Sequence, residues 1–227
     1  MYNPYAAVLF DVLHFMNGGI WGDHMFPQLK KHVSKIGRAA KVDLDNRFDK
    51  MPPWRGLNHF NGVTTVSFNN GSHHRDISKI FLFAVHSVIT EANNKAAYHV
   101  VKALQKYLNL YMYSLLNVQT ADTISLGREA LTEFYHSLQC YKQFCFDNPD
   151  LGKETWNFIK LHYLSHFFDN IEQKGAQHNF NTLLCKIYKL MTNFRDIRKQ
   201  ILWIEHQCLV AGIIRGQLDA LDKLLHN

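Results

Sequence analysis

The sequence predicts a mainly α-helical fold, and three observations support this class. Residues 25–36 carry apolar side chains at the 3.6-residue spacing of an amphipathic helix, namely Met25, Leu29, Val33 and Ile36. After residue 76 almost every segment continues in helical patterns. Only two short stretches, residues 6–10 and 63–68, suit β-strands. A few short strands beside many helices are therefore expected.

The first third of the chain combines one possible strand, one helix and a loop. Residues 6–10 are apolar without alternation, as in a short buried strand or the first turn of a helix. The amphipathic helix extends through residues 21–48, with Gly37 as a point of bending or interruption. Residues 51–76 contain Pro52, Pro53 and several glycines, so they are expected to form a loop with a brief extended piece at residues 63–68.

The remaining segments are expected to be helices. Asp76 is a candidate cap for the first of them, and Asp122 or Thr123 for the third. The predicted helices span residues 76–90, 95–116, 123–146, 156–174, 182–190 and 193–225.

The composition is that of a basic protein with enough apolar residues to fold. Hydrophobic residues make up 47% and aromatic residues 13%, enough for a packed core, and the formal net charge is +6 with 14 neutral histidines. This charge mildly favours a polyanionic partner. The cysteines form no C-x-x-C pair, and no signal peptide or membrane-spanning run is present, which favours a nuclear or cytoplasmic protein without membrane contact. Nucleotide-binding and hydrolase motifs are absent from the sequence, and we expect no small-molecule substrate.

Asp11 and His14 form a D-x-x-H pair directly after the first apolar run. A carboxylate at the end of a strand can hold Mg²⁺ or Mn²⁺ for phosphodiester chemistry. Asp is equally a common helix N-cap, and His a common half-buried polar residue. The pair alone leaves both interpretations open.

A second polar cluster lies in the predicted helix 156–174. His162, His166 and Asp169 are spaced i, i+4 and i+7, which would place all three on one helical face. Two histidines one turn apart can bind zinc, so a zinc-dependent enzyme is one hypothesis. The alternative is that these side chains form hydrogen bonds in the core or line a groove.

The chain also contains a basic cluster near its end, beside Tyr188 and Phe194. Such cations can neutralise phosphates while aromatic rings stack on bases, although the same pattern also suits a solvated helix face. The five cations are Lys186, Lys189, Arg195, Arg198 and Lys199.

Five blocks, in order, resemble the carboxyl-terminal half of Plavaka-type transposases, from CACTA-like DNA transposons of mushroom-forming fungi. The resemblance covers nearly the whole chain. The blocks are FDVLHFMNGGIWGDHMFPQLKKH, WRGLNHFNGV, DISKIFLFAVHSVIT, LHYLSHFFDNIEQKGAQHNFNT and YKLMTNFRDIRKQIL.

The resemblance implies a remnant of an RNase H-like α/β core that is interrupted by a helical insertion. In the intact family, three acidic residues hold two Mg²⁺ or Mn²⁺ ions that cut DNA at transposon ends. Asp11 would be the second acidic residue and metal ligand, and His14 would support it. The implied parts are residues 1–72 of the core, 73–150 of the insertion and 151–227 of the carboxyl-terminal helical part.

This sequence departs from the family pattern in two places. The portion expected to carry the first catalytic Asp would lie upstream of Met1, and the expected Glu after Thr182 is replaced by LLCKIYK. One carboxylate cannot position two ions. We therefore expect a truncated or degenerate transposase that does not cleave DNA by itself, retains DNA binding and holds no metal ion. The rival is a helical DNA-binding or protein-interaction module, and the oligomeric state is not indicated.

Overall fold

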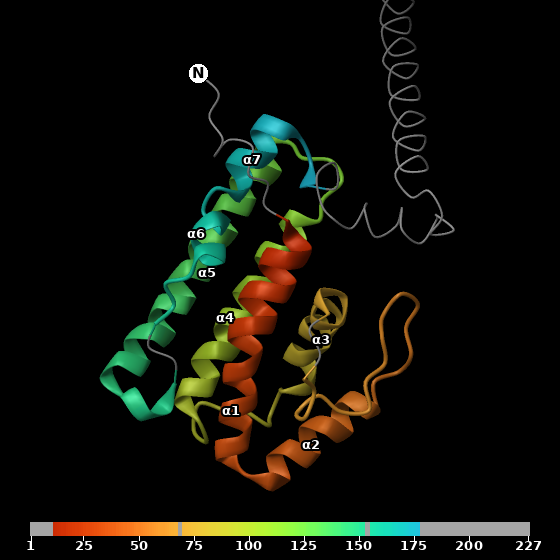
Figure 1. The fold of residues 1–227 in the computed structure, drawn as a ribbon, viewed down its shortest axis with the longest axis vertical. Helices are drawn as coiled ribbons and strands as arrows, with labels where there is room; N and C mark the ends of the chain where they lie inside the picture. Colours follow the sequence, from red (N-terminus) through yellow and green to blue (C-terminus); the bar gives the residue numbers. More distant parts are fainter. Residues whose placement is uncertain (1–10, 68–69, 153–154, 178–227) are drawn as a thin grey trace, which may run out of the picture. The chain divides into compact units, whose positions relative to one another are not determined.

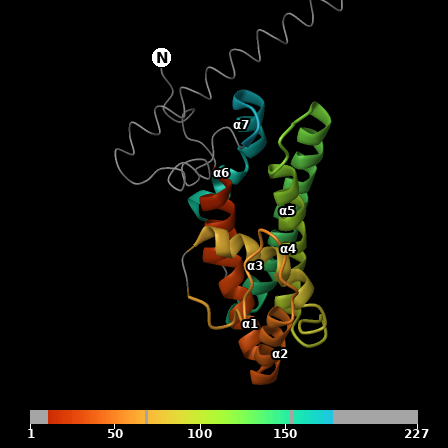
Figure 2. The same cartoon turned by 90° about the vertical axis from the view of Figure 1, so that its right-hand side faces the viewer.

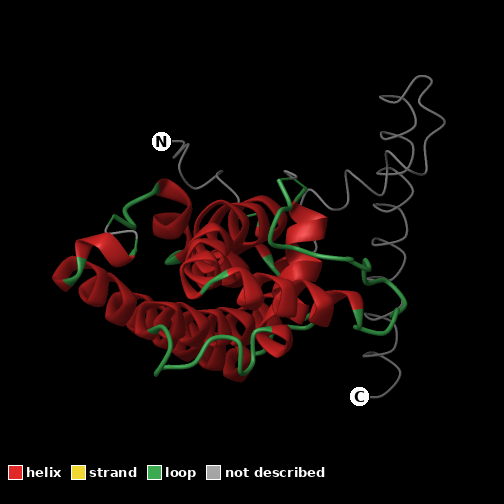
Figure 3. Cartoon of the chain, turned by 90° about the horizontal axis from the view of Figure 1, so that it is seen from below, coloured by secondary structure: helices red, strands yellow, loops and turns green. Residues whose placement is uncertain are grey.

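The computed structural model describes residues 11–67, 70–152 and 155–177, all within one compact unit, Met1–Asn181. In these ranges the chain forms helices and loops and no strand (Figure 3), which confirms the mainly α prediction. The boundaries proposed near residues 72 and 150 stay a prediction. The elements are η2 (Val12–Met25), α1 (Phe26–Ile36), α2 (Arg38–Asp49), α3 (Gly71–Ala84), α4 (Lys95–Ser114), α5 (Ala121–Asp147), η3 (Pro149–Leu151), α6 (Ile159–Leu164) and α7 (Phe167–Lys174).

The two predicted strands have different outcomes. Residues 6–10 lie outside the described residues. The extended piece predicted at residues 63–68 is wrong for its described part, because the chain turns there. Asp45 accepts hydrogen bonds from the backbone N–H groups of Val63 and Thr64, at 2.6 and 3.0 Å, and Val66 N donates to Val63 O. Local hydrogen bonds of this kind satisfy the backbone without a partner strand.

A long helical arm, η2 continued by α1, runs through the middle of the described part (Figure 1). The largest of its fully buried side chains is that of Trp21. The ring packs against Phe26, Phe81 and Tyr107, with centroids 5.3, 5.6 and 6.5 Å away. Aromatic pairs at such distances add about 0.5–1.5 kcal/mol each beyond their area burial. The arm is therefore held from α3 and α4 at once.

Gly37 interrupts the predicted amphipathic helix, as expected from the sequence. Its φ of 136° and ψ of 177° end α1 at Ile36 and start α2 at Arg38. This backbone conformation is open to glycine and strained for other residues. The chain changes direction here, and α2 leads into the loop before α3 (Figure 1).

Helices α4 and α5 lie side by side and form the longest helix pair of the described residues (Figures 1 and 2). Asn94 caps α4 by accepting from Ala97 N at 2.9 Å. Thr120 caps α5 in a reciprocal capping box with Thr123. The predicted cap at Asp122 or Thr123 was thus misplaced by two or three residues, although Thr123 does take part in it. Such caps typically contribute about 1 kcal/mol.

Helix α3 differs from the prediction at both ends. Asn70 is its N-cap and accepts from Ser72 N, whereas Asp76, the predicted cap, lies inside the helix and is fully buried. The helix ends at Ala84 instead of residue 90 because the chain turns, and Ser87 has a φ of 63°. The buried carboxylate therefore serves tertiary structure and does not begin the helix.

The helix predicted for residues 156–174 is two shorter helices. Helix α6 ends at Leu164 and α7 begins at Phe167. Between them, Ser165 N donates to His162 O and His166 N to Tyr163 O, tighter bonds than those of an α-helix. Leu164, Phe167 and Phe168 are buried at the i, i+3 and i+4 spacing of one helix face, which is why the apolar pattern predicted a single helix across the break.

Candidate functional site

Asp11, the predicted metal ligand, is the N-cap of η2. Its Oδ1 accepts from Leu13 N at 3.0 Å, and its Oδ2 accepts from His14 Nδ1. The Asp11 residue is 6% exposed, while most of the His14 side chain remains open to solvent. Both carboxylate oxygens are thus engaged in local hydrogen bonds. This contact pattern is the one expected of a helix cap, the alternative that the sequence left open.

The stretch after Asp11 is a π-helix, a conformation that is rare and is often found at functional sites. The bond from Phe26 N to Trp21 O has the i to i−5 register that defines it. Two glycines let neighbours approach closely. A Cβ at Gly19 would lie 2.2 Å from Lys160 Cδ of α6, and one at Gly22 would lie 2.8 Å from the His74 ring of α3. The glycines therefore allow α3 and α6 to pack on the π-helix.

The other acidic residues in contact with the arm or with α3 have partners of their own. Asp23 pairs with Lys160 Nζ at 3.0 Å, and Asp76 pairs with Arg75 Nε at 2.8 Å. Within residues 11–67, 70–152 and 155–177, no group of three or more His, Cys, Asp or Glu side chains is arranged to hold a metal ion. The described residues around Asp11 thus do not fit a two-ion centre, which needs converging carboxylates.

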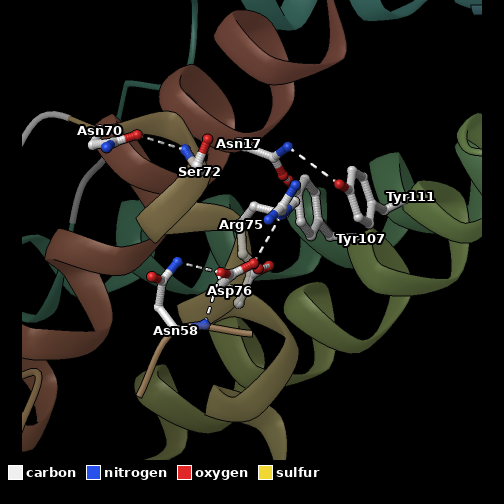
Figure 4. Close-up of polar contacts among 9 residues, drawn as sticks. Asn17, Asn58, Asn70, Ser72, Arg75, Asp76, Tyr107 and Tyr111 are labelled. Carbon is white, nitrogen blue, oxygen red and sulfur yellow. Dashed lines mark hydrogen bonds and ion pairs between the residues drawn. The ribbon is translucent and has the colours of Figure 1, made fainter. Parts of the chain in front are cut away.

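A buried polar cluster links the π-helix to α4 (Figure 4). Tyr107 donates its hydroxyl hydrogen to Asn17 Oδ1 at 3.2 Å, and Asn17 Nδ2 donates to the Tyr111 hydroxyl at 3.3 Å. Burial raises the pKa of both tyrosines. They remain neutral hydroxyls that satisfy a buried amide, so this cluster fixes the position of η2 against α4. No sequence pattern indicated Asn17 as the partner of these two tyrosines.

A second cluster joins α3 to the loop before it (Figure 4). Asp76 Oδ2 accepts from both the backbone N–H and the side-chain amide of Asn58, at 3.1 and 2.6 Å. Its Oδ1 accepts from Arg75 Nε. A buried carboxylate is costly unless paired and hydrogen-bonded, and these contacts meet that requirement. The loop that follows α2 is therefore held against α3.

His162, His166 and Asp169 do not share one helix face, because the helix breaks between the histidines. The two rings lie edge to face at 5.4 Å, and His166 Nδ1 lies 3.8 Å from Asp169 Oδ2. Asp169 Oδ1 accepts from Arg128 Nη2 at 2.8 Å. All three residues are exposed instead of lying in the core. The neighbouring Arg128 already neutralises the carboxylate that would complete a metal site.

The basic cluster at residues 186–199 lies outside the described residues, so its arrangement stays a prediction. Trp54 and Phe83, two large side chains that are exposed on the loop and on α3, were not among the residues predicted from the sequence. The signal for Trp54 was a tryptophan directly after Pro52 and Pro53, where no helical period places it in a core.

Comparisons of the chain with protein-family models, curated proteins and solved structures gave no match. Among the described helices, none has the length and apolar character needed to cross a bilayer.

Proposed function

We propose that this chain is a transposase-derived helical protein that binds DNA without cutting it. The proposal rests on the resemblance of five ordered sequence blocks and on the formal charge of +6. Cations that neutralise phosphates release bound counterions, which drives sequence-independent binding to DNA.

The observation that carries the absence of cleavage is the bonding of Asp11. A metal-binding carboxylate in a two-ion centre directs its oxygens toward the ions together with other acids. Both oxygens of Asp11 instead accept hydrogen bonds from Leu13 and His14. The replacement of the expected Glu after Thr182 supports the same conclusion from the sequence.

A nicking assay tests this proposal. Purified protein is incubated with supercoiled plasmid and linear duplex DNA in Mg²⁺ or Mn²⁺. We expect no metal-dependent nicking from the wild type or from Asp11→Asn. Cleavage by the wild type that Asp11→Asn abolishes would show that the proposal is wrong.

DNA binding is tested by duplex titrations at several salt concentrations. The double variant Lys189→Glu and Arg198→Glu should bind more weakly, and its logarithmic salt slope should fall by about 2, since each phosphate contact contributes about 0.9. The matched control is Lys31→Glu and Arg38→Glu, which makes the same charge change at two exposed positions. Equal weakening of both double variants would contradict binding through the cluster.

A protein-interaction module is the second candidate, and one observation favours it. Apolar side chains are exposed around the connection between α4 and α5, as interaction surfaces often are. They are Met112, Leu115, Leu116, Val118 and Leu126. The same titration discriminates the two functions: a chain that fails to bind duplex DNA even at low salt would favour the protein-interaction module.

A further inference from the structure

A hollow of about 640 Å³ lies between the loop after α2 and the outer face of α3. Two large aromatic side chains line it, Trp54 from the loop and Phe83 from the helix, and they are 73% and 71% exposed. Met51, Leu57 and Ile80 contribute apolar surface. Soluble proteins rarely leave two large aromatic side chains this open around one concave surface unless it binds something.

The charged residues that line the hollow are both cationic. They are Arg55 and Lys79, and within the described part of the chain neither forms an ion pair. Burial, and to a smaller extent the nearby Arg75, lower the pKa of Lys79, while Asp76 raises it. The hollow on the other side of Phe83 instead contains both Glu91 and Lys102. The surplus of positive charge is therefore specific to the Trp54 side.

Hydrogen bonds fix the loop that forms one side of the hollow. Leu57 N donates to Trp54 O at 3.1 Å and closes a turn. Asn58, the next residue, donates two hydrogen bonds to the buried Asp76. Lys79 and Phe83 are one turn apart on the same face of α3. A ligand would thus meet a loop and a helix whose backbones are already in place, which reduces the ordering cost of binding.

We propose that this hollow binds an unpaired nucleotide of a single-stranded nucleic acid. A nucleobase is a flat apolar ring that stacks on aromatic side chains whatever its sequence, and its phosphates carry the negative charge that Arg55 and Lys79 complement. Bases in a duplex are stacked on each other and cannot enter the hollow. The inference uses described residues alone and does not depend on a transposase origin or on the cluster at residues 186–199.

The test is binding of a fluorescent oligothymidylate of about ten nucleotides, a length within the usual site size, to the full chain. Trp54→Ala and Phe83→Ala should each weaken binding by about fivefold or more, because loss of one base–aromatic stack has that order of effect. The double variant Arg55→Ala and Lys79→Ala should weaken binding and reduce its salt slope. Binding of a blunt duplex should change little in Trp54→Ala and Phe83→Ala.

Phe146→Ala is the matched control, since Phe146 is 72% exposed but lies at the end of α5, away from the hollow. It should bind the oligonucleotide like the wild type. Thermal unfolding of each variant checks that the fold is intact. We expect it to be, because the mutated rings are largely exposed and contribute little to the core.

Three results would overturn the proposal. The first is unchanged oligonucleotide binding in Trp54→Ala and Phe83→Ala. The second is an equal loss in Phe146→Ala. The third is full competition by free thymidine monophosphate at equal nucleotide concentration, which would assign the hollow to a small nucleotide instead of a strand.

Discussion

The start of η2 and the hollow beside α3 differ in where their polar groups find partners. At the start of η2, Asp11 is 6% exposed and bonded to Leu13 and His14. At the hollow, Arg55 and Lys79 have no ion-pair partner among the described residues, and the nearby Trp54 is open to solvent. The position that resembles a catalytic acid thus has the contacts of a helix cap. The binding site proposed here lies instead where no catalytic residue was expected.

The largest expected effect comes from removing the contact that holds the loop. Asp76→Ala leaves Asn58 and Arg75 without their buried acceptor, and we expect a loss of about 3 kcal/mol in the free energy of unfolding. Urea denaturation measures it. Asp43→Ala, which removes an exposed ion pair with Arg47, should cost no more than about 0.5 kcal/mol. Similar losses in both variants would mean that the loop is not held by Asp76.

The second effect is a loss of stability at low pH that we assign to the buried His32 and not to exposed histidines. Burial first, and then Lys35 and Lys31, lower the pKa of His32 to about 4. The unfolded chain, with a histidine pKa near 6.5, then binds more protons between these values. Stability is complete above pH 6.5 and falls as the pH drops toward 4, by about 2 kcal/mol at pH 5.

Denaturation at pH 7 and pH 5 measures this loss. His32→Gln, which keeps a polar partner for Tyr141, should remove most of the difference. His86→Gln, at an exposed position, should keep it. A pH effect of full size in His32→Gln would assign it to other groups.

The smallest effect tests the role of Asp11 directly. Asp11→Ala removes the N-cap of η2 and should lower the free energy of unfolding by about 1 kcal/mol. Asp11→Asn retains an oxygen that can cap Leu13 and should cost only a few tenths of a kcal/mol. Thermal or urea unfolding distinguishes the two. A loss as large in Asn as in Ala would point to a need for the charge itself.

Helical periodicity predicted most of the fold because the buried faces of α1, α4 and α5 repeat over several turns. It failed where tertiary contacts decide. Asp76 has the chemistry of a cap, but its bonds to Asn58 come from 18 residues away. The break between Leu164 and Phe167 was also missed, because the buried residues on both sides of it keep the apolar period of one helix.

The candidate site was harder to predict. From the sequence, Asp11 was either a metal ligand at the end of a strand or a helix cap. Both roles use the same carboxylate, and the bonds to Leu13 and His14 are those of a cap. Trp54 and Phe83 lie 29 positions apart in the sequence, so their shared surface depends on the loop being held against α3. Their spacing in the sequence could not predict that the two side chains line one hollow.

The bend at Gly37 has a consequence for how the chain can change over time. A methyl group at this position would meet nothing within 4 Å, so space does not limit the residue. The backbone does, because its combination of φ and ψ costs other residues about 1–3 kcal/mol. The backbone torsion at this position, and not the size of the side chain, would therefore decide which substitutions are tolerated. An alanine that adopted helical torsions instead would favour one continuous helix in place of α1 and α2.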